Sequence, residues 1–176
     1  MNSVKTLPDN AFYSCENLQS VVLGEDLEDI GTAPFSGCDS LTSVGGNDNY
    51  ICTNGIIYEN NDTGKTIIEC LSSRGDLVGS SYVDADTDPE LVDVTEIAEG
   101  AFQNCGSIMS VDFSQSEGLT KIPRDCFDGD DNLISVILPD TVDEINDGAF
   151  TNTRKYLSVT VPAIEVAIAT DAFDDI

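Results

Sequence analysis

Phenylalanine recurs along the chain at a nearly constant spacing, and this period constrains the fold more than any other feature. Successive anchor phenylalanines are separated by 23, 67, 25, 23 and 23 residues. The anchors are Phe12, Phe35, Phe102, Phe127, Phe150 and Phe173. Periods of about 20 to 50 residues are typical of solenoids and related arrays, in which each repeat forms one structural unit. The spacing therefore predicts a stack of coils with one irregular interval.

Each coil carries the same apolar positions around its anchor. A large apolar residue follows six positions after each of the first five anchors, and a valine follows nine positions after it. These pairs are Leu18 and Val21, Leu41 and Val44, Ile108 and Val111, Leu133 and Val136, and Tyr156 and Val159. Stacked coils can bury such a set in a continuous core, whereas a single coil cannot. The β-branched segment around each valine predicts one short parallel strand per coil.

A second extended segment is expected before each anchor. An apolar residue lies five positions ahead of every anchor. These residues are Leu7, Ile30, Ile97, Ile122, Ile145 and Ile168. The A-F-x-x-C stretch that follows is too short for an independent helix, so we expect a tight or 3₁₀ turn there. The predicted fold class is a solenoid that is mostly β in content.

The 67-residue interval between Phe35 and Phe102 predicts an insertion in the array. Residues 47–93 are its least regular part, and we place them between the second and third repeats. Two β-prone runs, Ile56 to Tyr58 and Thr66 to Ile68, flank the turn-forming sequence Asn60-Asn61-Asp62-Thr63-Gly64. Such an arrangement is typical of a β-hairpin.

The repeat I-x-x-x-A-F-x-x-C-x-x-L-x-S-V-x-(L/V) closely resembles the BspA-type leucine-rich repeats of bacterial and protist surface proteins. The segment Asn54-Gly55-Ile56-Ile57-Tyr58 is similar to one with which members of that family interrupt their repeats. The resemblance implies a leucine-rich repeat solenoid of the α/β horseshoe class, with residues 1–176 as a single domain. It also implies display at the cell surface or secretion. The chain begins and ends within a repeat, so we expect a fragment of a longer array, or ends that pack on further repeats.

The charge of the chain restricts its partners. Its 33 acidic and 7 basic residues give a net charge of −26. Such a surface repels nucleic-acid backbones and anionic lipid headgroups, so we expect no nucleic-acid partner. No run of about 18 apolar residues is present, so we expect no direct membrane insertion. Residues 1–10 lack the features of a secretion signal, which keeps a cytoplasmic location as the alternative.

Histidine is absent from the sequence, which removes the histidine-based triads, general bases and metal sites. No phosphate-binding glycine loop is present, because Gly64-Lys65-Thr66 lacks the preceding glycine of that motif. We therefore expect no cofactor and no enzymatic activity.

The cysteines are interpreted as structural thiols. Cys15, Cys38 and Cys105 share one position in the coil, where small thiols can fill a turn. Cys52 and Cys70 flank the predicted hairpin and are candidates to meet across it. No C-x-x-C pair is present, so we expect all six cysteines to be reduced.

Two acidic runs have the carboxylate density of calcium loops. They contain Asp84, Asp86 and Asp88, and Asp128, Asp130 and Asp131. Neither run has the glycine at the sixth place, and Thr95 stands where the first would need a bidentate glutamate. We interpret both as solvated acidic loops, and only as weak candidates for a metal site.

One face of the predicted strands is the candidate binding surface. A serine precedes the inward valine in each coil and should form a polar ladder, without a base to make it nucleophilic. The ladder is Ser20, Ser43, Ser110, Ser135 and Ser158. The neighbouring positions vary from coil to coil, as in an interaction surface. The candidate partner-binding residues are Gln19, Val22, Thr42, Met109, Asp112, Ile134, Ile137, Leu157 and Thr160.

These observations support one function and leave two alternatives open. The first is a non-catalytic repeat scaffold that binds a protein or glycan partner at the cell surface. The second is a structural spacer within a longer surface protein. The third, and the weakest, is a β-solenoid enzyme that acts on polysaccharides through paired carboxylates, because such enzymes have coils of similar length.

Overall fold

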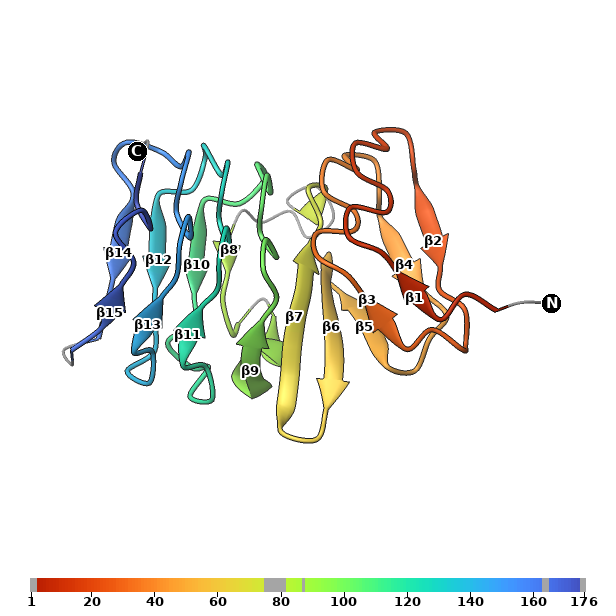
Figure 1. Ribbon diagram of the computed structural model, residues 1–176, viewed down its shortest axis with the longest axis horizontal. Helices are drawn as coiled ribbons and strands as arrows, with labels where there is room; N and C mark the ends of the chain where they lie inside the picture. The colour runs from red at the N-terminus through yellow and green to blue at the C-terminus, as the bar shows by residue number, and fades with distance from the viewer. Residues whose placement is uncertain (1–2, 75–81, 87, 163–164, 175–176) are drawn as a thin grey trace.

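The chain forms a solenoid of mostly parallel strands, which confirms the predicted fold class (Figure 1). The computed structural model describes residues 3–74, 82–86, 88–162 and 165–174. Helical structure is scarce and includes the short 3₁₀ helix η1 (Pro89–Asp93). The strands are β1 (Thr6–Leu7), β2 (Ser20–Val22), β3 (Asp29–Ile30), β4 (Ser43–Gly45), β5 (Tyr50–Thr53), β6 (Ile56–Asn61), β7 (Gly64–Cys70), β8 (Tyr82–Val83), β9 (Val94–Ile97), β10 (Ser110–Asp112), β11 (Lys121–Ile122), β12 (Ser135–Ile137), β13 (Glu144–Ile145), β14 (Ser158–Thr160) and β15 (Ala167–Ile168).

The strands around the repeated valines pair in parallel, in the register that the repeat predicts. Strands β8, β10, β12 and β14 form one sheet, and β2 and β4 form another. Val111 pairs with Val136, and Val136 with Val159. The serines of these strands pair in the same way, so the predicted serine ladder is present, but in two separate pieces, one in each sheet. Because side chains alternate along a strand, the valines point inward and the serines outward.

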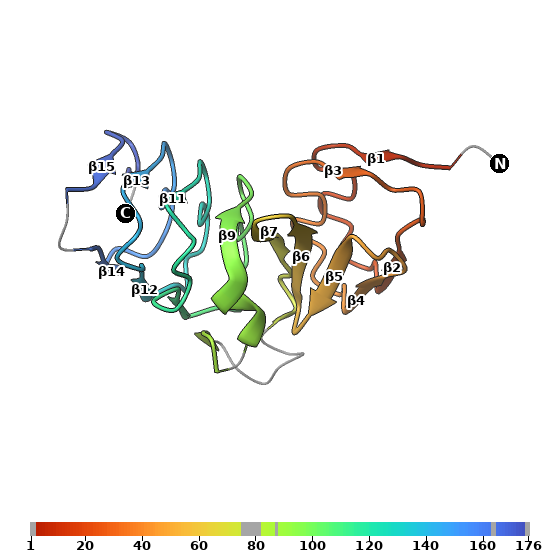
Figure 2. The same ribbon diagram turned by 90° about the horizontal axis from the view of Figure 1, so that it is seen from below.

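The upstream isoleucines form a second set of parallel strands on the other side of the coil. Ile122 pairs with Ile145, and Ile145 with Ile168, in the sheet of β11, β13 and β15. Leu7 pairs with Ile30 between β1 and β3. Figure 2 shows β11, β13 and β15 on one side of the solenoid and β12 and β14 on the other. Each regular coil therefore contributes two short strands, as expected.

The anchor phenylalanines stack between these two strand sets. The Phe102 and Phe127 rings lie 4.9 Å apart, those of Phe127 and Phe150 5.2 Å, and those of Phe150 and Phe173 4.9 Å. The first four anchors lie in tight turns, in which the backbone N–H three residues after the phenylalanine donates to its carbonyl, as Cys105 does to Phe102. At Phe150 the hydroxyl of Thr153 donates to the carbonyl instead. The predicted turns are thus confirmed.

The insertion forms the predicted hairpin, which also divides the interior of the molecule. Strands β6 and β7 are antiparallel, and β7 pairs in parallel with β9 of the next coil. Ile56 and Ile67 pack into the core of the C-terminal coils, whereas Ile57 and Ile68 pack into the core of the N-terminal coils. The hairpin is therefore a wall that is buried on both faces. We name the coils before it (residues 3–45) the N-terminal stack and those after it (residues 94–174) the C-terminal stack.

A buried carboxyl group completes the coil that faces the wall. In other coils the backbone N–H of the anchor phenylalanine donates to a carbonyl of the next coil, as Phe102 does to Cys126. The anchor Phe35 has no such coil after it, and its N–H donates to Oε2 of Glu69 at 2.9 Å. Glu69, near the end of β7, thus replaces the missing backbone acceptor at the junction between the stack and the hairpin.

One apolar position was predicted incorrectly. Tyr156 occupies the spacing of the inward leucine, but its side chain is 81% exposed. Leu157 packs against the core in its place, and its N–H donates to Arg154. The corresponding bond of the preceding coil runs from Leu133 to Asp130, so the turn after Phe150 contains one more residue.

Candidate binding face

The exposed side of the β8, β10, β12 and β14 sheet combines apolar and acidic side chains. Tyr82 pairs with Ser110 and so takes the place of the serine at the edge of the ladder. Its side chain is 53% exposed. Met109, which directly precedes the ladder serine of β10, is 38% exposed. The sequence did not reveal Tyr82 as a site residue, because no anchor phenylalanine precedes β8.

The candidates of the C-terminal stack lie together on this sheet. Asp112 pairs with Ile137, and Ile137 with Thr160, so these side chains form one row beyond the inward valines. Asp112 and Ile137 are half-buried and Thr160 is exposed. Ile134 lies beside Met109, because its N–H donates to the Met109 carbonyl at 2.8 Å. We define the binding face as Tyr82, Met109, Asp112, Ile134, Ile137 and Thr160.

The remaining candidates do not join this face. Gln19, Val22 and Thr42 are exposed, but they belong to the β2 and β4 sheet. The wall of β6 and β7 lies between the two sheets along the solenoid (Figure 1). Leu157 is also removed from the exposed set, since it packs against the core. The single surface predicted from the sequence is therefore divided into two.

Two hollows border the binding face at the carboxyl ends of its strands. One, of about 370 Å³, is lined by Asp84, Asp86, Asp112 and Val92, among others. The other, of about 480 Å³, includes Ile137, Asp140, Thr160 and Val161 in its lining. Parallel strands end at the same edge of a sheet, which gathers these residues from separate coils. This edge of the binding face thus carries carboxylates beside its apolar side chains.

Local hydrogen bonds hold the carboxylates of the first hollow. The Asp112 carboxylate accepts the Ser114 N–H at 2.8 Å, and the Asp84 carboxylate accepts the Asp86 N–H at 3.1 Å. These are turn contacts in which an aspartate caps the backbone two residues on. They leave other lone pairs of the Asp112 carboxylate for a partner, because an ionised carboxylate can accept several hydrogen bonds.

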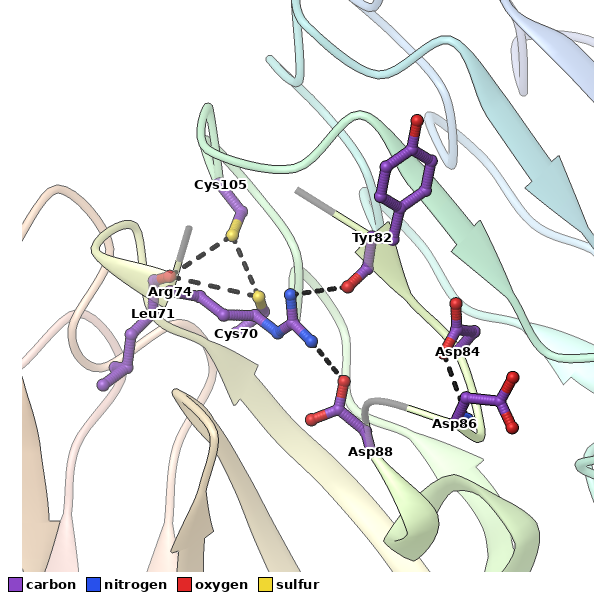
Figure 3. Close-up of polar contacts among 8 residues, drawn as sticks. All are labelled: Cys70, Leu71, Arg74, Tyr82, Asp84, Asp86, Asp88 and Cys105. Atoms are coloured by element: carbon purple, nitrogen blue, oxygen red, sulfur yellow. Dashed lines mark hydrogen bonds and ion pairs between the residues drawn. The ribbon is translucent and has the colours of Figure 1, made fainter. Parts of the chain in front are cut away.

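A buried ion pair holds the edge strand of the face (Figure 3). The Arg74 guanidinium contacts the Asp88 carboxylate, and both side chains are buried. Nη1 of Arg74 also donates to the Tyr82 carbonyl at 2.8 Å. The first residue of β8 and Asp88 are thereby linked to Arg74, which follows the hairpin. These contacts position the backbone of Tyr82 within the sheet.

The family is decided by a match that covers most of the chain. The sequence profile described as BspA type leucine-rich repeat region matches residues 1–69 and 89–176, in six copies. The chain belongs to the BspA-type leucine-rich repeat family. This confirms the resemblance seen in the repeats. No curated protein sequence matches the chain.

Solved structures support the same fold for this BspA-type chain. A leucine-rich cell surface protein from Faecalibacterium prausnitzii A2-165 is similar with a TM-score of 0.59 and 19% identity, over 97% of this chain and 53% of that one. The pneumococcal vaccine antigen PcpA is similar with a TM-score of 0.51 and 15% identity, over 89% of this chain and 48% of that one. The chain thus spans about half the length of these two proteins.

Each acidic run of the BspA-type chain contains one buried aspartate, which the prediction of solvated loops missed. Asp88 is buried against Arg74, and Asp130 is buried inside its coil. Burial disfavours the charged form and raises the pKa of the Asp130 carboxyl well above its ordinary value. Asp84, Asp86, Asp128 and Asp131 lie at or near the surface. Within the described residues, no group of three or more acidic or cysteine side chains is arranged to hold a metal ion.

The six cysteines carry free thiols, but their arrangement differs from the predicted column. Cys38 and Cys105 are buried, whereas Cys15 is exposed. Cys52 and Cys70 do not meet across the hairpin, because Cys52 packs toward the N-terminal core and Cys70 toward the C-terminal core. They belong to β5 and β7, which are separated by β6. The predicted contact between them is therefore wrong.

Within the described residues of the BspA-type chain, no helix is both long enough and apolar enough to cross a membrane.

Proposed function

We propose that this chain is a non-catalytic repeat scaffold whose binding face recognises a protein partner. The observation that carries the proposal is the group of accessible apolar side chains, Tyr82, Met109, Ile134 and Ile137, on a sheet whose ladder is otherwise serine. Exposed apolar groups of this kind mark interaction sites more often than chance. Tyrosine and methionine are among the residues enriched in protein interfaces.

The charge around the binding face favours a basic partner over a neutral one. Asp84, Asp86 and Asp112 line one hollow at its edge, and Asp140 lines the other. The whole chain has a net charge of −26. Complementary charges raise association rates and select against anionic partners. The expected ligand is a protein segment that presents lysine or arginine beside apolar side chains.

A location at the cell surface is part of this proposal. The Faecalibacterium protein of similar fold is described as a cell surface protein. The BspA-type family to which the chain belongs contains surface proteins, as the sequence resemblance implied. Binding of a partner outside the cell is consistent with both, and with the strongly anionic surface.

The test uses substitutions that copy the residue found at the equivalent position of another coil. Tyr82→Ser restores the ladder residue, Met109→Thr copies Thr42 of the second coil, and Ile137→Thr copies the paired Thr160. A triple variant should keep the fold, because each new residue occurs at the equivalent place in another coil. Val22→Thr, on the separate β2 and β4 sheet, is the control. Val22 is 83% exposed, so this control removes an exposed apolar side chain away from the face.

Binding is measured on arrayed peptides that combine basic and apolar residues, with glutamate-substituted versions of the same peptides beside them. We expect basic peptides to bind and the triple variant to lose roughly tenfold or more in affinity, because each buried apolar side chain contributes about 1.5 to 3 kcal/mol. The control should bind as the wild type does. Affinity should fall as salt is added, since exposed charges are screened.

Three outcomes would contradict the proposal and favour the alternatives. Binding on a glycan array, with none on peptides, would assign the face to a carbohydrate. No binding to either array would favour the alternative role of a structural spacer. Hydrolysis in a screen of polysaccharides, lost on changing Asp112 to Asn, would favour an enzyme.

A further inference from the structure

Two buried thiols meet where the hairpin joins the C-terminal stack (Figure 3). Sγ of Cys70 and Sγ of Cys105 are 3.0 Å apart. The two residues are 3% and 0% exposed. Sγ of Cys105 also lies 3.4 Å from the Leu71 carbonyl oxygen. The sulfur atoms are thus about 1 Å farther apart than in a disulfide bond, whose length is about 2.05 Å.

The backbone on both sides of this contact is held by hydrogen bonds. The N–H of Cys70, at the end of β7, donates to the Ala101 carbonyl at 2.6 Å. The N–H of Cys105 donates to the Phe102 carbonyl at 3.0 Å, which closes the turn after the anchor. The approach of the two side chains therefore follows from the position of β7 against the first coil of the C-terminal stack. A bond between the sulfurs needs a side-chain shift and no rearrangement of strands.

We propose that Cys70 and Cys105 form a disulfide bond when the chain folds in an oxidising compartment, and that this bond joins the hairpin covalently to the C-terminal stack. The oxidant is an external disulfide, either a small molecule or a disulfide oxidoreductase. The thiolate of one cysteine attacks the external S–S bond, forms a mixed disulfide and releases one thiol. The second cysteine attacks the mixed disulfide and releases the other thiol. The two protein thiols lose two electrons and two protons, and the external disulfide gains them.

The timing of the reaction follows from the burial of the pair. Contact with Cys70 and burial raise the pKa of the Cys105 thiol well above its ordinary value. The thiolate is the reactive form, so the folded chain reacts slowly. The exchange therefore takes place during folding, while both thiols are accessible. Once the wall has packed, the bond is shielded from reductants as well.

The other cysteines have different surroundings. Cys15 is exposed, and Sγ of Cys38 donates to the Phe12 carbonyl at 3.0 Å. Cys52 packs against the N-terminal core, and Cys126 is buried in the C-terminal core. Within the described residues, Cys70 and Cys105 are the pair whose sulfur atoms are in contact.

The bond would constrain the segment that supplies the edge of the sheet. Cys70 and Cys105 are 35 positions apart, and the loop between them contains β8, η1 and β9. Closing such a loop reduces the conformational entropy of the unfolded chain. The oxidised form should melt roughly 10 °C above the reduced form. This inference is independent of the proposed partner binding.

The test is a thiol map of the wild-type chain refolded in a buffer of oxidised and reduced glutathione. The protein is denatured without reductant, alkylated, digested and analysed by mass spectrometry. We expect four alkylated cysteines and one disulfide-linked peptide pair that contains Cys70 and Cys105. Six alkylated cysteines, or a disulfide that joins any other pair, would overturn the proposal.

Two variants separate the cross-link from the effect of losing a buried cysteine. Cys105→Thr copies Thr153, whose hydroxyl donates to the Phe150 carbonyl at the same place in its coil. Cys126→Ala copies Ala149, the equivalent residue of the next coil. The melting difference between oxidised and reduced protein should disappear in Cys105→Thr and persist in Cys126→Ala. The thiol map of the wild type decides the question even if a variant does not fold.

Discussion

Phe127 lies between two other rings, with Phe102 at 4.9 Å and Phe150 at 5.2 Å, both nearly parallel to it. Its side chain is fully buried in the C-terminal core. Each ring gains from the burial of its own surface and from contact with its neighbours above and below. At the scale of single residues, the anchor phenylalanines of the middle coils should therefore be the strongest determinants of stability.

Phe127→Ala should lower the free energy of unfolding by about 3 to 5 kcal/mol, because it leaves a cavity between two rings that cannot close it. The measurement is chemical denaturation followed by circular dichroism. Phe12→Ala is the matched control: Phe12 is half-buried and stacks on Phe35 at a longer distance of 5.6 Å. Its loss should cost clearly less. Equal losses in the two variants would show that stacking in the middle of the array adds nothing.

Several residue positions followed from the sequence, and the two failures have different causes. The valine and isoleucine columns were predicted correctly because each residue sits at a constant distance from its anchor. Tyr156 was misplaced because the turn after Phe150 contains one more residue. Asp130 was predicted to be exposed because it is charged. It is buried, because it occupies the position in its coil that the buried Cys105 occupies in another. Periodicity predicted position wherever the turn length was constant, and side-chain charge alone did not predict exposure.

At the scale of elements, the sequence predicted the two strands of the hairpin. It did not predict that the hairpin separates two cores and is buried on both faces. Its alternation between Ile56 and Ile57 and between Ile67 and Ile68 places apolar groups on both faces, as in a strand buried on both sides. The sequence does not say which coil each face meets. The contacts of Glu69 with Phe35 and of Cys70 with Cys105 depend on that packing. The division of the binding face depends on it as well.

Glu69 makes the junction between the hairpin and the N-terminal stack sensitive to pH. Burial raises the pKa of its carboxyl to about 8, and the hydrogen bond from the Phe35 N–H lowers it by less. The folded state therefore binds this proton more tightly than the unfolded chain does. The stabilisation is complete below the ordinary pKa of about 4.5 and is lost as the pH rises through about 8.

Glu69→Gln should remove this pH dependence, because the amide keeps an acceptor for Phe35 and does not ionise. The free energy of unfolding of the wild type should fall relative to that of the variant between about pH 5 and pH 9, by an amount on the order of a few kcal/mol. Denaturation at a series of pH values measures the difference, in which the other titrating groups cancel. Glu96→Gln, at an exposed position of β9, is the control and should parallel the wild type. A constant difference between wild type and Glu69→Gln across this range would contradict the prediction.

At the scale of the whole molecule, the wall separates two hydrophobic cores of unequal size. In the C-terminal stack the anchors Phe102, Phe127 and Phe150 are fully buried. In the N-terminal stack one anchor, Phe35, is buried, whereas Phe12, Leu18 and Val21 of its outer coil are half-buried. Solenoids behave as nearly one-dimensional systems, in which the stability of a coil depends on its neighbours. The two stacks are therefore expected to open with different free energies.

Hydrogen exchange tests this difference directly. Amides of β2 and β4 should exchange about tenfold faster or more than those of β10 and β12, because local opening of the N-terminal stack leaves the other core intact. Phe127→Ala should speed exchange in β10 and β12 and change it little in β2 and β4, since its cavity lies beyond the wall. If all four strands exchanged with one opening free energy, and the substitution lowered it equally in each, the molecule would unfold as one unit. The wall would then couple the two cores instead of separating them, and the smaller core would be stabilised by the larger one through β6 and β7.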